Sequence, residues 1–149
     1  MLFRSHAFSV AQHCLLVETL TAACARVSRD GRLAALLHDA PEYVVGDLIS
    51  PFKAAVGIDY KDFERRLLAA IHIRFGLPPG LAPELTRAIK RADMLAAYFE
   101  ATQLAGFGVT EAKRFFGTPP KDLKAPNLKA LPTAEAQARY LARFQQLSG

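Results

Sequence analysis

The sequence predicts an all-α fold, a single domain built as a bundle of five to six helices. Apolar residues recur at helical spacing along nearly the whole chain, and no segment of useful length alternates as a strand would. The chain has 149 residues, of which 51% are hydrophobic and 22% charged, and it contains no internal repeat. This length and composition suit one globular domain, residues 1–149, and exclude disordered and disulfide-rich classes.

The N-terminal part of the chain predicts two helices. Ser9 followed by Gln12 has the capping-box pattern and opens the first helix, whose apolar periodicity fades near Ser28. We expect Asp30-Gly31 to end this helix and the second helix to run from about Arg32 to Tyr43.

The middle of the chain predicts two longer helices. The third spans Tyr60 to Phe75 and is closed by Gly76, which can adopt the left-handed backbone that ends many helices. The fourth spans about Pro83 to Leu104, and Gly106 follows it.

The C-terminal part predicts a long loop and a last helix. Residues 117–132 contain four prolines and three lysines and have no helical period, which is typical of a functional or mobile loop. Thr133 is expected to cap the last helix, which carries apolar residues at helical spacing, namely Tyr140, Leu141, Phe144 and Leu147.

The net charge of +5 is weak evidence for nucleic-acid binding. The basic residues are spread over helix faces without interleaved aromatic side chains, so solvated faces are favoured and no specific nucleic-acid partner is expected. The longest apolar stretches, such as residues 94–99, are far below the roughly 18 residues of a membrane span. Polar residues interrupt the N-terminus, so no secretory signal is expected. We therefore expect a cytoplasmic protein with no membrane partner.

The two cysteines fit a reducing compartment. Cys14 and Cys24 are ten positions apart in a helical run, which separates them by about 15 Å at 1.5 Å per residue and prevents a disulfide bond. We expect both to be small buried apolar residues.

Four metal-compatible side chains are expected to point at the core from three helices. His38 and Asp39 are adjacent and follow the apolar run 33–37, which places them in the middle of the second predicted helix. His13 has apolar neighbours on its helix face, and Asp93 repeats this pattern on the fourth helix. Polar groups in an apolar core are costly when they lack partners.

These four side chains form a ligand set for one divalent ion. Two imidazoles and two carboxylates suit Mn²⁺, Fe²⁺, Co²⁺, Ni²⁺, Zn²⁺ or, less well, Mg²⁺. An ion that keeps positions open for water and for a substrate oxygen makes a hydrolytic site. Taken singly, His13 is more often a hydrogen-bonded core residue and Asp93 a surface ion-pair member beside Lys90 and Arg91. Jointly, the four have no easy apolar explanation.

Three segments that carry these residues resemble one enzyme superfamily. The string LHDAPE at residues 37–42, with GDL at 46–48 and PFK at 51–53, is similar to the signature of HD-domain metal-dependent phosphohydrolases. Residues 9–13 and 89–98 resemble the first-histidine segment and the final-aspartate helix of the small bacterial 5'-deoxynucleotidase-like branch. The resemblance covers about residues 8–103.

The resemblance implies a role for each matching residue. His13, His38, Asp39 and Asp93 would hold the metal ion. Glu42, one turn beyond the ligand pair, would orient or deprotonate the attacking water, and Asp47 would position the leaving group or act as general acid. Lys53 and Arg4 are candidates for neutralising phosphate charge. For Asp47 a turn-capping role stays open, and for Lys53 and Arg4 a solvated surface role stays open.

Two features narrow what the resemblance implies. Two-metal members of the superfamily draw on further histidines, whereas this chain has only His6 and His72 left, and His72 has a core-like pattern. One metal ion is therefore expected. Only twelve residues precede His13, so the N-terminal segment in which relatives contact the nucleotide is short here. Recognition of the base is therefore altered, incomplete or shared with a partner subunit.

The resemblance predicts a metal-dependent phosphohydrolase that cleaves a phosphate monoester, most plausibly a (deoxy)nucleoside 5'-monophosphate, by attack of metal-bound water on phosphorus. A deoxynucleoside triphosphate triphosphohydrolase is the alternative enzyme, and a non-catalytic module that binds metal and nucleotide is the alternative of another class. The 117–132 loop is then either a lid over substrate phosphates or a mobile surface loop. A mean hydropathy of +0.10 and exposed-looking Phe107, Phe115 and Phe116 favour a homo-oligomer.

Overall fold

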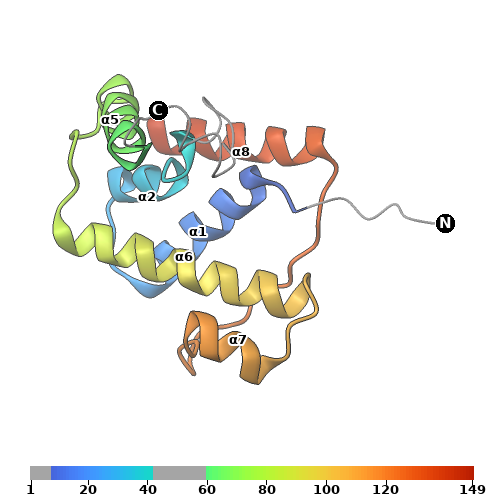
Figure 1. Cartoon of the computed structure of the whole chain (residues 1–149). Coiled ribbons are helices and arrows are strands. Elements are labelled where there is room, and N and C mark those ends of the chain that lie inside the picture. Colours follow the sequence, from blue (N-terminus) through green and yellow to red (C-terminus); the bar gives the residue numbers. More distant parts are fainter. Residues whose placement is uncertain (1–7, 42–59) are drawn as a thin grey trace.

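The computed structural model describes residues 8–41 and 60–149, and within them the chain is all-helical, as predicted. These residues form six helices and no strand (Figure 1). In chain order the helices are α1 (Val10–Cys24), α2 (Arg29–Leu36), α5 (Tyr60–Arg74), α6 (Pro83–Gln103), α7 (Val109–Phe116) and α8 (Thr133–Ser148).

Helix α1 is the central element of the bundle. Figure 1 shows it between α6 on one side and α8 on the other, and it also contacts α2. Because neighbours surround it, α1 buries more than one face, and Cys14 and Val17 are fully buried. Its start is the predicted one, since the Ser9 hydroxyl accepts a hydrogen bond of 3.2 Å from the backbone N–H of Gln12.

The boundary between α1 and α2 differs from the prediction. Helix α1 ends at Cys24, and Ser28 caps α2 by accepting a 3.1 Å hydrogen bond from the backbone N–H of Gly31. Asp30 and Gly31 therefore lie in the first turn of α2 and do not end α1. A Cβ atom on Gly31 would lie 3.3 Å from side-chain atoms of Leu85 and Val27, so a glycine allows this close approach.

The second helix is predicted to continue through His38, but it ends before that residue. Helix α2 ends at Leu36, residues 37–39 form a turn, and helical structure resumes at residue 40. The hydrogen bonding tightens here, since the N–H of Ala40 donates to the carbonyl of Leu37 at 2.9 Å. His38 and Asp39 are therefore presented by a turn instead of the middle of a helix. The predicted end at Tyr43 lies outside the described residues.

Helices α5 and α6 match their predicted ranges to within a residue at the ends. Gly76 after α5 has φ of +79° and Gly106 after α6 has φ of +76°, so both positions require the left-handed conformation that glycine adopts without strain. Helix α7, which the sequence reading did not separate from its surroundings, packs on the side of α6 away from α1 (Figure 1).

Residues 117–132 form no helix, as predicted, but two glutamines attach their second half to the bundle. The buried side chain of Gln12 donates to the carbonyl of Lys129 at 2.8 Å and accepts from the N–H of Leu131 at 3.0 Å. Gln103 makes the matching pair with the carbonyl of Pro126 and the N–H of Leu128. We call residues 126–131 the strap. The lid interpretation of this loop stays a prediction.

Three smaller expectations need correction. Pro132 occupies the N-cap of α8 and Thr133 is its first residue, with no side-chain cap. Cys24 is exposed, although Cys14 is buried as expected. Phe115 is exposed as expected, whereas Phe107 and Phe116 pack partly buried against the core.

Among the helices described, none is both long and apolar enough to cross a membrane.

Candidate metal centre

His13 faces inward from the first half of α1, and both of its ring nitrogens have partners. Nε2 lies 2.9 Å from Oδ1 of Asp93 and 3.5 Å from Oδ2 of Asp39. Nδ1 donates to the carboxylate of Glu100, with Oε2 at 2.9 Å and Oε1 at 3.2 Å. The side chain is 19% exposed, so these contacts form at the edge of the core.

The turn after α2 aims His38 at the same place. Its Nδ1 donates to the backbone carbonyl of Ala35 at 2.8 Å, which fixes the ring and directs Nε2 away from the backbone. Nε2 then lies 3.2 Å from Oδ2 of Asp39 and 3.5 Å from Oδ1 of Asp93. The turn thus presents a histidine and a carboxylate together.

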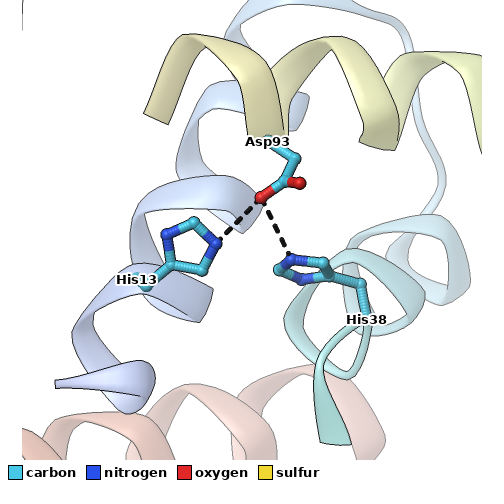
Figure 2. Close-up of side chains that lie close together, drawn as sticks. All are labelled: His13, His38 and Asp93. Atoms are coloured by element: carbon cyan, nitrogen blue, oxygen red, sulfur yellow. Dashed lines mark hydrogen bonds and ion pairs between the residues drawn. The ribbon is translucent and has the colours of Figure 1, made fainter. Parts of the chain in front are cut away.

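Asp93 comes from the middle of α6 and completes the cluster. Figure 2 shows His13 on α1, His38 after α2 and Asp93 on α6 converging, with one carboxylate oxygen of Asp93 facing both imidazoles. Ligand atoms of these three residues all lie within 4.8 Å of one another. Metal–ligand bonds of about 2.0–2.2 Å place ligand atoms at comparable separations, so the three can share one ion.

Asp39 lies beside this trio and contacts both imidazoles. One of its ligand atoms also lies within 4.8 Å of ligand atoms of His38 and Cys14. Cys14, fully buried on α1, is therefore a neighbour of the cluster that the sequence reading treated only as apolar filling. All four predicted metal ligands are thus brought together from three separate segments.

The hydrogen bonding around Nε2 of His38 is incomplete. This atom is buried and makes no well-directed hydrogen bond within the described residues, although two carboxylate oxygens lie within 3.5 Å. No Lys or Arg among the described residues forms an ion pair with Asp39, Asp93 or Glu100. Within residues 8–41 and 60–149, three carboxylates therefore surround two imidazoles without a Lys or Arg partner, and such a donor set fits a divalent metal ion.

The electrostatics of the cluster favour positive charge. Burial alone lowers the pKa of His13, but hydrogen bonds to Asp93 and Glu100 outweigh it and raise that pKa to about 10. Burial likewise opposes the charged form of His38, and Asp39 and Asp93 beside its ring raise its pKa to about 12. The two imidazoles in turn hold the pKa of Asp93 well below its usual range. The site therefore attracts either protons or a metal cation.

The other predicted site residues lie outside the described residues. These are the candidate catalytic residues Glu42 and Asp47 and the candidate phosphate-binding residues Arg4 and Lys53. His72 lies on α5, is 2% exposed and donates from Nδ1 to the carbonyl of Pro78 at 3.1 Å, which fits the predicted core role.

Glu100 is the contact that the sequence reading missed. It lies seven positions after Asp93, about two turns along α6, so both carboxylates share one face of the helix. That spacing is a signal in the sequence, but it identifies Glu100 only once His13 is known to lie opposite α6.

No family model matches the chain. It is 49% identical over 144 residues to the uncharacterized protein RCAP_rcc00048 of Rhodobacter capsulatus, a match that covers 95% of this chain and 74% of the relative. It is 30% identical over 147 residues to the uncharacterized protein YfdR of Escherichia coli K12, covering 97% of this chain and again 74% of the relative. By these similarities the chain belongs to the same family as RCAP_rcc00048 and YfdR.

Proposed function

We propose that the protein is a metal-dependent phosphohydrolase of the HD-domain type that cleaves a (deoxy)nucleoside 5'-monophosphate. The observation that carries the proposal is the convergence of His13, His38 and Asp93 within 4.8 Å, with Asp39 beside them. These are the four positions that the resemblance in sequence assigns to the metal.

The chain's own residues would hold one divalent ion through two imidazoles and two carboxylates. His38 is oriented by the Ala35 carbonyl and His13 by Glu100, so each presents Nε2 to the centre. A divalent ion bound there would lower the pKa of a water ligand and polarise a phosphoryl oxygen, and so would supply a nucleophile and charge stabilisation.

The remaining roles rest on the resemblance. Glu42 would orient or deprotonate the attacking water, Asp47 would assist the leaving group, and Arg4 and Lys53 would neutralise phosphate charge. A net charge of +5 favours a small anionic substrate. We extend the proposal to a homo-oligomer, since Phe115 on α7 is an exposed aromatic side chain. We also propose a cytoplasmic location, since Cys14 and Cys24 are both free thiols.

The deciding experiment is a nucleotide panel assayed with added Mn²⁺ or Co²⁺. Release of inorganic phosphate from a nucleoside monophosphate supports the proposal. Release of tripolyphosphate from a deoxynucleoside triphosphate would instead identify a triphosphohydrolase. Metal binding without turnover of any nucleotide would identify a non-catalytic module.

A variant tests the assigned water-activating group. Glu42→Ala is expected to reduce kcat by about 10²–10⁴-fold, the usual contribution of a general base, while metal binding persists. The control is Glu84→Ala, which removes an exposed carboxylate from the first turn of α6. Full turnover by Glu42→Ala would refute this role for Glu42.

A further inference from the structure

Helix α6 holds His13 by both ring nitrogens. Asp93 faces Nε2 at 2.9 Å, and Glu100, about two turns later on the same helix face, takes Nδ1 at 2.9 and 3.2 Å. Two contacts from one rigid helix fix both the position and the rotation of the imidazole. Without Glu100, only the contacts at Nε2 would orient the ring.

The contact at Nδ1 determines which nitrogen can bind an ion. A carboxylate accepts but cannot donate, so Nδ1 must carry the proton in this hydrogen bond. In the neutral ring, the lone pair is then at Nε2, the atom that faces Asp93 and Asp39. Glu100 therefore selects the tautomer with which His13 can act as a ligand.

The two histidines of the site are oriented through the same atom by different acceptors. His38 donates Nδ1–H to the neutral carbonyl of Ala35 at 2.8 Å, whereas His13 donates to a charged carboxylate. A charged acceptor makes the stronger hydrogen bond and increases the electron density at the opposite nitrogen. His13 is thus the histidine whose ligand strength the chain has increased.

We infer that Glu100 is a positioning residue that tightens metal binding by fixing the tautomer and orientation of His13. The inference rests on the proposed metal site. A purely structural ion pair between α1 and α6 would use the same contact, but its loss would change stability and leave metal affinity unaltered.

The test measures Co²⁺ affinity by competition with a chromophoric chelator, together with the visible absorption spectrum of bound Co²⁺. Glu100→Ala is expected to weaken Co²⁺ binding about 10–100-fold, the usual effect of losing such a partner, and to alter the spectrum. Glu100→Gln keeps an acceptor oxygen but loses the charge, so it is expected to weaken binding less. The control Glu84→Gln changes an exposed glutamate on the same helix and should match the wild type.

The outcomes separate the inference from the proposed function. If the wild-type protein binds no Co²⁺ or Mn²⁺, both the metal site and the role of Glu100 fall. If the wild type binds Co²⁺ and both Glu100 variants bind it as tightly as the wild type does, only the role of Glu100 is overturned. Should Glu100→Ala fail to fold, the near-isosteric Glu100→Gln decides, since weaker binding supports the role and unchanged binding refutes it.

Discussion

Helix α1 carries two clusters of charged side chains that the fold treats in opposite ways. Glu18 is fully buried, and its carboxylate binds Arg32 of α2 at 3.3 Å and also Arg143 of α8. His13, five positions earlier on the helix, lies among the carboxylates of Asp39, Asp93 and Glu100. One cluster therefore combines one anion with two cations, and the other combines three anions with two titratable rings.

This difference in charge indicates that the Glu18 cluster is a structural ion-pair network, which we call the joint, and that the His13 cluster is a candidate ligand site. Permanent guanidinium charges neutralise Glu18 within the chain, and the three side chains join α1, α2 and α8. Around His13 and His38, no Lys or Arg of the described residues supplies that charge, and Nε2 of His38 lacks a well-directed partner. A cluster whose carboxylates find no Lys or Arg partner among the described residues can be neutralised by protons or by a bound cation, and this property makes it a candidate site.

Removing the arginines from Glu18 should have the largest effect on stability. The double variant Arg32→Met and Arg143→Met leaves a buried carboxylate without a cation, so we expect a loss of about 3–5 kcal/mol in the free energy of unfolding, measured by urea denaturation. The folded fraction should bind Co²⁺ as the wild type does. A loss below about 1 kcal/mol would show that the joint is not structural.

Removing Asp93 should have the opposite result, a large loss of metal affinity and a small change in stability. Asp93→Ala takes away an oxygen that faces both imidazoles, so Co²⁺ affinity should fall by more than the roughly 10–100-fold typical of a partner that only supports a ligand. Its side chain is 46% exposed, so the unfolding free energy of the chelator-treated protein should change by only about 1 kcal/mol. Unchanged metal affinity would show that Asp93 is not a metal ligand and would favour the alternative, a surface ion-pair residue.

The two clusters should also differ in their response to pH. His13 and His38 have raised pKa values in the fold, so their stabilisation of the metal-free protein is complete below the unfolded value of about 6.5. It is lost as the pH rises through about 10 for His13 and toward about 12 for His38. We expect the Tm of chelator-treated protein to fall between pH 6 and pH 9, whereas metal binding strengthens because the ligands must lose protons.

A variant control assigns this pH effect to the site. Replacing both His13 and His38 by Gln should flatten the pH dependence of Tm in the metal-free protein. The arginines beside Glu18 keep their charge throughout this range, so that cluster contributes little to the slope. A slope that survives in the double variant would contradict the assignment.

Losses of stability smaller than at Glu18, with no change in metal affinity, are expected at the strap. Gln12→Met leaves the N–H of Leu131 and the carbonyl of Lys129 without their buried partner, and we expect a loss of about 1–3 kcal/mol by urea denaturation. The exposed Gln103 makes the same two kinds of hydrogen bond, and its replacement by Met should cost about 0.5–1.5 kcal/mol. Equal losses of unfolding free energy in the two variants would indicate that the burial of Gln12 does not strengthen its hydrogen bonds relative to those of Gln103.

The helices were predictable where local signals agree. The side-chain cap at Ser9, the proline at the start of α6 and the glycines after α5 and α6 all act within a few residues, and those boundaries match. The prediction failed at Asp30-Gly31, where Ser28 caps a new helix and places both residues in its first turn, and after Leu36, where residues 37–39 form a turn despite the helical apolar pattern.

The sequence by itself determined the residue types of the candidate metal centre, since two histidines and two aspartates in apolar surroundings need a shared partner. It could not distinguish Glu18 from Glu100, or assign Arg32 to a buried ion pair instead of a solvated face. Those roles depend on contacts that are distant in the sequence. His13 and Glu100 are 87 positions apart and Glu18 and Arg143 are 125 positions apart, so these contacts form only when α1 packs against α6 and α8. The tertiary structure decided which carboxylates meet arginine and which meet histidine, because the net charge around each group depends on neighbours from other helices.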